Sequence, residues 1–489
     1  MSHKYEKNQP ISGDLLGGHY ATMAEEEKLE RSLGNRHIQL IAIGGAIGTG
    51  LFMGSGKTLA VSGTSILLTY TIIGFFFFFV MRAMGELLLS NTHYKSFADF
   101  ATAYLGPWAG FFLGWSYWLS WIVTAIADII VIGGYAQFWF PDMPAWIPAF
   151  FTISLLTVLN LLTVKLFGEM EFWFALIKII AIIVFLCIGV YLIAIGFTSP
   201  DGVKASLSHI TESGSIFPYG ISGFLSGFQI AVFAFMGIEL VGTTAAETKN
   251  PEEVLPKAIN TIPVRILLFY VGALVCIIAV TSWAKISPNQ SPFVHMFTLI
   301  GLPAAASLVN FVVATSAMSS ANSGIFATSR MLYGLSVEKD APVWFKKLSS
   351  RKVPVNSLLF SMLCVVIGAS ILFFVPNVMK AFTIISTLTS ILIIFTFAMI
   401  LISYLAYRKK APHLHESSVY KMPGGNFMAW MTLVFLGFVT VILALDHDTM
   451  ISLVCSPIWF IGLYIAYKRH SKRDLERTWI LQHGKRIEK

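Results

Sequence analysis

Charged residues are scarce in this chain of 489 residues. Only 12% are Asp, Glu, Lys or Arg, whereas 56% are hydrophobic and the mean hydropathy is +0.72. A soluble domain carries about 25% charged residues, so a soluble globular protein is excluded. A membrane span needs about 20 apolar residues. Charge-free runs suitable for spans cover 37–56, 58–81, 100–127, 143–164, 179–200, 213–238, 266–284, 296–329, 353–379, 381–407, 422–445 and 449–467.

The chain also lacks the residue groupings of an enzyme or a metal site. Its four cysteines lie far apart in apolar runs, and none of its 11 histidines falls in the middle of a span. No disulfide, metal site, cofactor or histidine relay is therefore expected. No nucleophile is paired with a base, so the sequence does not indicate catalysis.

Nucleotide-binding motifs are incomplete. "GSGKT" at Gly54–Thr58 resembles the end of a phosphate-binding loop, but Leu51 stands where that motif requires glycine. Gly48-Thr49-Gly50 is followed three residues later by Met53, so the dinucleotide fingerprint fails as well. We expect no nucleotide at either place.

The basic residues indicate topology rather than a nucleic-acid partner. Residues 1–36 contain no apolar core, so we expect a cytoplasmic tail and no cleavable signal. With this tail inside and Lys178 within a span, nearly all of the 34 Lys and Arg residues face the cytoplasm. The exceptions outside are Lys57, Lys204, Lys285 and Lys380. This bias places both termini in the cytoplasm.

Two apolar runs are interrupted by residues that weaken a helix. "IAIGGAIGTGLFMGSGKT" at 41–58 contains six glycines, each costing roughly 1 kcal/mol relative to alanine in a helix interior. "GFQIAVFAFMGIELVGTTAAE" at 227–247 is interrupted by Gly237, Glu239 and Gly242. Corresponding broken segments in two halves of a membrane protein indicate an inverted-repeat transporter.

The predicted fold is all-α, with twelve membrane helices in a 5+5 inverted repeat and two extra helices. Ten helices are the alternative if one short run is re-entrant. Repeat one would cover about 37–200, repeat two about 213–407, and the extra helices about 422–467, within a transporter domain of 37–468. Residues 469–489 would form a second cytoplasmic tail.

Unwound backbone is tolerated at membrane depth only where it lines a cavity or is buried in protein. Free N–H groups at the start of a half-helix can hold a carboxylate, and free carbonyl groups can hold an ammonium group. The alternative is that the glycines serve close helix packing.

Three ionisable residues are expected within the membrane, where each costs roughly 2.5 to 3.5 kcal/mol to insert. Burial disfavours a charged Lys178, which could therefore load and release a proton, or its ammonium group could reach the interface. For Asp128 the sequence leaves three roles open: a proton carrier, a partner for a cation, or a structural hydrogen-bond acceptor. Glu239 follows the second interruption, where it could gate, accept a proton or cap a half-helix.

The predicted eighth span, with "ATSAMSSANSGIFATSR", carries polar side chains that can coordinate a cation, bind a lysine ammonium group or join helices. These residues are Thr315, Ser316, Ser319, Ser320, Asn322 and Ser323.

The chain resembles the bacterial amino acid permeases of the amino acid, polyamine and organocation superfamily. The resemblance runs from about Asn35 to the end of the chain. The segments that carry it include "NRHIQLIAIGGAIGTGLFMGSGKT", "MRAMGELLLSN", "GPWAGFFLGW", "YAQFWFPD", "KLFGEMEFWFA", "FAFMGIELVGTTAAETKNPE" and "SSANSGIFATSRMLYGL". It implies the LeuT-type fold and proton-coupled uptake across the bacterial inner membrane.

The resemblance also implies roles for individual residues. Gly48, Thr49 and Gly50, with Ile47 before them, match the segment that binds the substrate carboxylate. Phe235, Met236, Gly237 and Ile238 match the segment that faces the ammonium group. Lys178 aligns with a lysine that replaces a sodium ion, and Glu239 with a glutamate proposed to sense protons. Aromatic permeases carry glutamate at the place of Asp128, and Ser319, Ser320 and Ser323 would support the site.

The function that the resemblance implies is import of a small neutral amino acid, of the D-serine, D-alanine and glycine class, together with protons. The alternatives are an amino acid exchanger of the same fold and a permease for a different neutral amino acid. Membrane lipid would surround the protein. The sequence does not predict its oligomeric state.

Overall fold

The computed structural model describes residues 47–91, 96–162, 164–200, 202–212, 214–243, 250–445 and 447–483. Within these ranges the regular structure is helical, apart from an isolated antiparallel bridge between Thr198 and Lys204. The all-α prediction is therefore confirmed for this part of the chain. The predicted tail at 1–36 lies outside it.

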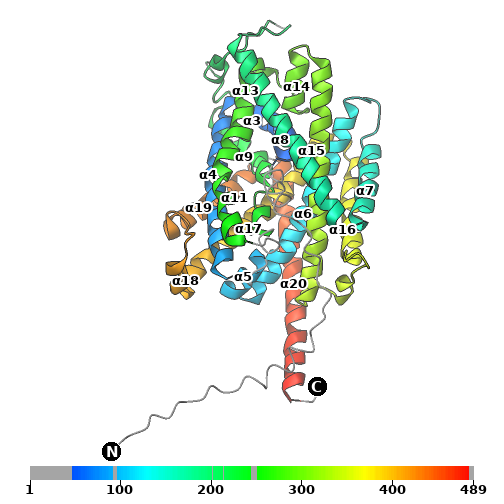
Figure 1. Cartoon of the computed structure of the whole chain (residues 1–489), viewed down its shortest axis with the longest axis vertical. Helices are drawn as coiled ribbons and strands as arrows, with labels where there is room; N and C mark the ends of the chain where they lie inside the picture. Colours follow the sequence, from blue (N-terminus) through cyan, green and yellow to red (C-terminus); the bar gives the residue numbers. More distant parts are fainter. Residues whose placement is uncertain are drawn as a thin grey trace, which may run out of the picture.

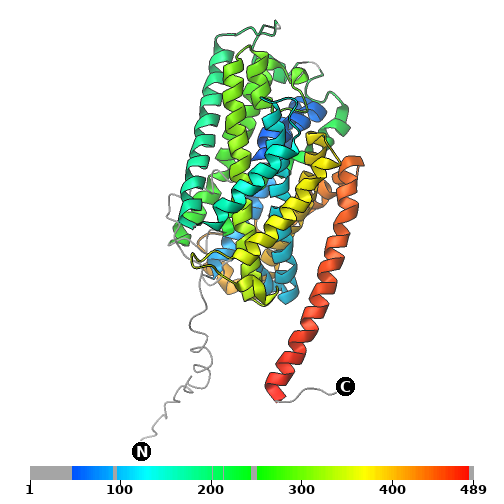
Figure 2. The same ribbon diagram turned by 90° about the vertical axis from the view of Figure 1, so that its right-hand side faces the viewer.

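Nine helical segments in the described ranges are long and apolar enough to cross a membrane. Figures 1 and 2 show most of the helices side by side in a bundle, with α20 projecting beyond one end. Two shorter apolar segments, Trp146–Leu161 and Gly220–Phe235, accompany them. The nine are Gly50–Ser90, Pro107–Gln137, Leu166–Ala194, Pro251–Thr281, Pro303–Val337, Val355–Phe373, Val378–Lys410, Gly425–Leu443 and Thr449–Arg469.

The helices that the following sections use can be located in Figure 1. They are α3 (Ser55–Ser62), α4 (Ile66–Ser90), α6 (Pro107–Gln137), α7 (Trp146–Leu161), α8 (Val164–Ala194), α9 (Gly220–Ala231), α11 (Pro251–Asn260), α13 (Ala273–Thr281), α15 (Pro303–Val337), α17 (Val378–Lys410), α18 (Pro412–Ser417), α19 (Gly425–Leu443) and α20 (His447–His483).

The predicted span boundary at Lys57 is wrong because the helix continues past this charged residue. Helix α3 runs through Lys57, whose Nζ donates to Thr383 Oγ1 at 3.2 Å. Asp128 and Lys178, which the sequence places within spans, lie inside α6 and α8. A buried charge with a polar partner does not end a helix, whereas a search for charge-free runs stops there.

The turn between α3 and α4 instead occurs at Gly63. Its φ is +59°, and a Cβ atom there would lie 2.5 Å from the carbonyl oxygen of Ser215. Both the left-handed backbone and this close approach require glycine. The segment Gly50–Ser90 therefore contains two helices.

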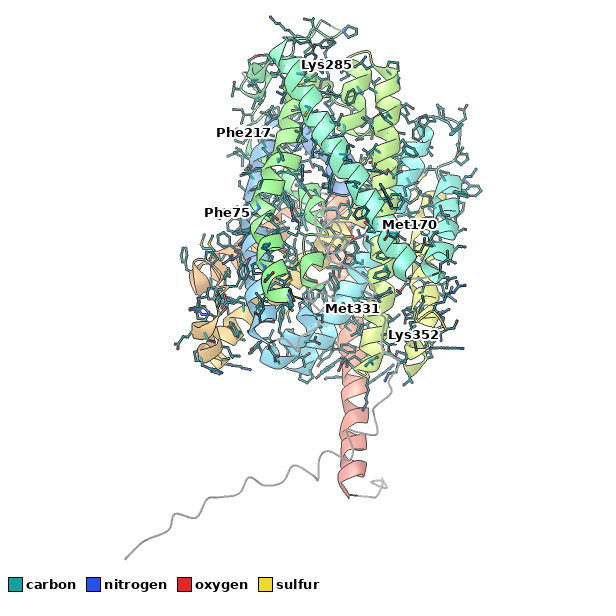
Figure 3. All side chains as sticks on the ribbon, in the orientation of Figure 1. Phe75, Met170, Phe217, Lys285, Met331 and Lys352 are labelled. Atoms are coloured by element: carbon teal, nitrogen blue, oxygen red, sulfur yellow. The ribbon has the colours of Figure 1, made fainter. Side chains whose placement is uncertain are left out.

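The centre of the bundle is formed by α6 and α17. In their most apolar stretches 83% and 72% of residues are buried, compared with 28% in α8 and 22% in α20. The outer helices expose large apolar side chains, such as Trp173 of α8. Figure 3 shows Phe75 between Lys285 and Lys352, which lie toward opposite ends of the molecule. This arrangement fits a bundle surrounded by lipid.

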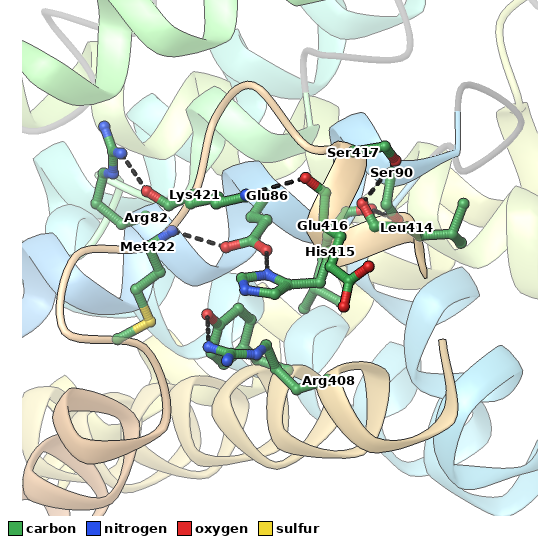
Figure 4. A network of polar contacts seen from close by, with 12 residues as sticks. Arg82, Glu86, Ser90, Arg408, Leu414, His415, Glu416, Ser417, Lys421 and Met422 are labelled. Atoms are coloured by element: carbon green, nitrogen blue, oxygen red, sulfur yellow. Dashed lines mark hydrogen bonds and ion pairs between the residues drawn. The ribbon is translucent and has the colours of Figure 1, made fainter. Parts of the chain in front are cut away.

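A polar network joins the end of α4 to the segment around α18 (Figure 4). The buried carboxylate of Glu86 accepts from the backbone N–H of Met422 at 2.7 Å and contacts His415 Nδ1 at 2.5 Å. One turn earlier, Arg82 donates to Asn260 Oδ1 of α11 at 2.7 Å and to the carbonyl oxygen of Lys421. These contacts hold three segments together at one end of the bundle.

Candidate functional site

The first interrupted segment is irregular where the glycines predict it. Ile47 and Gly48 lie in a bend, and Gly50–Gly54 forms a turn of π-helix, η1, before α3 begins. Single π-helical turns occur frequently at functional sites. Gly44 and Gly45 lie outside the described residues, so the structure describes only the second half of this segment.

The second segment is broken between two short helical pieces. Helix α9 is followed by the 3₁₀ turn η4 (Phe233–Phe235) and then by Met236 with an extended ψ of 135°. Gly237 has a φ of +100°, a backbone conformation that other residues rarely adopt. The chain then re-enters a helix at α10 (Leu240–Thr243).

The two breaks are in direct contact. A Cβ atom on Gly50 would lie 2.4 Å from the Cα atom of Ala234 and 3.0 Å from the carbonyl carbon of Phe233. Any side chain at Gly50 would therefore separate η1 from η4. The absence of a side chain lets two irregular backbones, nearly 200 residues apart in sequence, approach each other in the interior.

Lys178 reaches the first break from α8. Its Nζ donates to the carbonyl oxygen of Ile47 at 3.4 Å, and Ser316 Oγ donates to the same oxygen at 3.1 Å. The side chain is only 1% exposed, so the ammonium group does not extend to the surface of the bundle. A carbonyl group at the break is thus bound by a cation and a hydroxyl group.

Asp128 contacts the same segment from α6. Its Oδ1 accepts from Thr49 Oγ1 at 2.5 Å, whereas Oδ2 has no hydrogen-bond partner among the described residues. Asp128 also interacts with Ser320 of α15 and with the charge of Lys178. These contacts suit both a structural acceptor and a proton carrier.

Gly48 and Ser320 retain accessible surface although their neighbours Ile47, Thr49 and Ser319 are buried. A Cβ atom on Gly48 would lie 3.7 Å from Ser320 Oγ. Gly48 of the first break and Ser320 of α15 therefore face each other closely.

Glu239 binds the backbone of the second break. Its Oε2 accepts from the backbone N–H of Gly237 at 2.9 Å, and its Oε1 accepts from Tyr117 at 3.3 Å. Gly237 precedes α10, so this contact holds the backbone of the break and leaves open which of the three predicted roles Glu239 has. Both oxygen atoms are occupied in this arrangement.

The side chain of Phe235 packs away from the first break. It stacks on Tyr270 with the ring centroids 5.1 Å apart, and it contacts Tyr70 at 5.7 Å. Tyr270 also donates to the carbonyl oxygen of Ala234 at 2.9 Å. Of the predicted segment Phe235–Ile238, it is therefore the backbone at Met236 and Gly237 that forms the irregular part of the site.

Glu171 is a buried charged residue close to this site that the sequence reasoning missed. It is 1% exposed in α8, and its Oε1 accepts from Ser319 Oγ at 2.6 Å. Glu171 precedes Lys178 by seven residues, which is two helical turns, so both share one face of α8. This seven-residue spacing is the signal in the sequence from which Glu171 could have been identified. Ser319 and Ser323, which were predicted to support the site, lie next to Glu171 rather than next to Asp128.

The family model for the amino acid permeases matches residues 37–480. The chain therefore belongs to the amino acid permease family, within the amino acid, polyamine and organocation superfamily. It is a multi-pass membrane protein, and its bacterial relatives are named as permeases and transporters.

Individual relatives cover almost the whole chain. A D-serine/D-alanine/glycine transporter from Escherichia coli K12 is 59% identical over 442 residues, which are 90% of this chain and 94% of that protein. An amino-acid permease from Bacillus subtilis is 51% identical, with 92% and 96% covered. A DL-alanine permease from Lactococcus lactis subsp. cremoris is 42% identical, with 92% and 98% covered.

Proposed function

We propose that this protein imports small neutral amino acids, foremost D-serine, D-alanine and glycine, by proton symport with alternating access. The observation that carries the proposal is the contact between η1 and η4 at Gly50 and Ala234. Broken segments that meet inside a membrane protein are typical of a transporter site. The similarity to a D-serine/D-alanine/glycine transporter supports this substrate class.

The substrate would lie between the two breaks. Its carboxylate would bind N–H groups of Gly48, Thr49 and Gly50, where the helix starts and its dipole favours an anion. Its ammonium group would face the backbone of Met236, Gly237 and Ile238. Because η1 and η4 approach each other closely at Gly50, little space separates the two backbones, and this favours a small substrate.

The preference for a neutral side chain would follow from the charges nearby. Glu239 is occupied by Gly237 and Tyr117, and Asp128 by Thr49. A charged substrate side chain would find no carboxyl group near the breaks beyond these two, which already bind the protein, and an unpaired charge is costly in a buried site.

Proton coupling would act through Lys178 and Asp128. Both contact the segment that would bind the carboxylate, because Lys178 binds Ile47 and Asp128 binds Thr49. A change in protonation at either residue would alter hydrogen bonds one or two residues from the substrate. Glu239 would act on the second break in the same way.

The full architecture would be twelve helices in a 5+5 inverted repeat with two added helices. Both termini would lie in the cytoplasm, as the Lys and Arg distribution favours. Rocking of one repeat against the other would then open the site to each side in turn.

Purified protein in proteoliposomes tests the proposal. An inward proton gradient should drive uphill accumulation of labelled glycine into vesicles without internal amino acid, and a protonophore should abolish it. Accumulation only in vesicles preloaded with amino acid would instead identify an exchanger. D-serine and D-alanine should compete with glycine, whereas preferential competition by L-alanine or L-phenylalanine would indicate a different neutral substrate.

A further inference from the structure

A second buried polar group lies between α7, α8 and α15. We call it the Glu171 cluster. Glu171 of α8 binds Ser319 of α15, and Asn160 of α7 donates to Asn322 Oδ1 of α15 at 2.8 Å. The cluster comprises Glu171, Asn160, Ser319, Asn322 and Ser323, all of which are at least nine-tenths buried.

The cluster is not fully hydrogen-bonded. Glu171 Oε2, Asn322 Nδ2 and Ser323 Oγ are buried and make no hydrogen bond to another described residue. Asn322 and Ser323 nevertheless lie close enough to act on the Glu171 carboxyl group. A cluster with a purely structural role is expected to satisfy its buried polar atoms. Open donors around one carboxylate oxygen instead indicate a group whose hydrogen bonds change during function.

The cluster is linked to Lys178. The two residues are about 10 Å apart along α8, at 1.5 Å per residue, and Lys178 interacts electrostatically with both Glu171 and Asp128. Ser316, which shares the Ile47 carbonyl oxygen with Lys178, stands one turn from Ser319 on α15. On α8 the residues between Glu171 and Lys178 are apolar, so the polar side chains beside this stretch come from α15.

Few other charges face Glu171. The helices and turns that pack most extensively against α8 are α7, α13, α15 and η6 (Ile266–Gly272), and α7, α13 and η6 contain no charged residue. Helix α14 (Pro292–Leu299), which carries His295, contacts α8 at Phe185, about four turns from Glu171. Helix α15 contributes Arg330, whose guanidinium group lies 3.2 Å from the centre of the Phe326 ring. Glu169 on α8 itself is half-buried. Lys178 is thus the charge that acts on Glu171 from the interior, and Asp128 in turn acts on Lys178.

We propose that Glu171 is the proton relay between Lys178 and the end of the bundle from which α20 projects. The proposal rests on the proton symport proposed above. A proton leaves Lys178 Nζ and binds Glu171 Oε2, so that an ammonium and a carboxylate become a neutral amine and a carboxylic acid. Glu171 then releases the proton to water at that end and becomes a carboxylate again. Lys178 takes up the next proton from the opposite side.

The test compares two modes of transport by the full chain in proteoliposomes. Proton-driven accumulation of labelled glycine requires proton release, whereas counterflow exchange of labelled for unlabelled glycine does not. Glu171→Gln should lower accumulation about tenfold and change counterflow by less than about twofold, since coupling between sites is typically worth 5–150-fold. Glu169→Gln, on the same helix, is the matched control and should leave both modes unchanged.

Glu171→Asp keeps a carboxyl group and should recover most of the accumulation. This second variant separates a relay from a packing role and remains informative if Glu171→Gln does not fold. Accumulation by Glu171→Gln at the wild-type level would overturn the relay, as would an Asp variant that exchanges glycine but does not accumulate it. If the wild-type protein itself shows no proton-driven accumulation, the proposed symport fails rather than the assignment of Glu171.

Discussion

Lys178 and Asp128 act on the same short segment, so their protonation can affect the substrate directly. Lys178→Met removes the ammonium group but fills a similar volume, and Asp128→Asn keeps an acceptor for Thr49 while removing the charge. Each change should lower proton-driven glycine accumulation by about tenfold or more, within the usual range of coupling free energies, and should leave measurable binding. Uptake at neutral and alkaline pH measures the effect.

The exposed Asp142 offers a control for the loss of a carboxylate. Asp142→Asn should transport as the wild type does. Normal accumulation by both Lys178→Met and Asp128→Asn would show that neither residue carries the coupling proton.

The individual residues of the site were only partly predictable. Lys178 and Asp128 stand out in the sequence because apolar residues surround them, and both are buried. Glu171 lies near Glu169 at the start of an apolar stretch, so it resembles an interfacial residue in the sequence. Its burial depends on polar partners that α15 brings from about 150 positions away, and hydropathy along one segment contains no information about them.

Gly50 lies directly against the backbone of the second broken element. Gly50→Ala places a methyl group where the Ala234 backbone already lies, so η1 and η4 must separate. Overpacking of this kind costs about 1–3 kcal/mol. We expect a lower melting temperature in detergent and loss of glycine uptake.

Gly334 on α15 provides a matched control for Gly50→Ala. A Cβ atom there would meet nothing within 4 Å. Gly334→Ala should keep transport and raise stability by up to about 1 kcal/mol through helix propensity. Equal transport by Gly50→Ala and Gly334→Ala would show that close contact between the breaks is unnecessary.

Glu86 connects the end of α4 to the chain that follows α17. Glu86→Ala removes acceptors for Met422 N–H and His415 and should destabilise this end by about 3 kcal/mol, at roughly 1.5 kcal/mol for each hydrogen bond to a charged group. Limited proteolysis should then cleave the segment around 410–424 faster. Glu416→Gln, at an exposed position of α18, should not change the cleavage rate. Unaltered cleavage in Glu86→Ala would contradict this role.

At the scale of elements, the positions of glycines predicted the irregular backbone better than the positions of charged residues predicted the helix ends. The breaks at 47–54 and 233–239 occur in both segments that the sequence singled out. The contact between them could not be predicted, because it depends on tertiary packing. Helix ends were misplaced at Lys57 for the same reason: its partner, Thr383, lies on α17.

The whole molecule was predictable as a membrane-spanning helical bundle because lipid permits few other structures. The proposed orientation of the molecule in the membrane leads to a further prediction. In a variant without the four native cysteines, Lys285→Cys should react with a membrane-impermeant maleimide in intact cells. Arg351→Cys, next to Lys352 toward the opposite end in Figure 3, should react only after permeabilisation. The reverse pattern would invert the proposed topology.

The location of a bound amino acid tests the central claim most directly. An experimental structure with D-serine or glycine should place the carboxylate within hydrogen-bond distance of the N–H groups at 48–50 and the ammonium group beside the backbone at 236–238. A ligand bound elsewhere in the bundle, with continuous helices through both of these segments, would contradict the account.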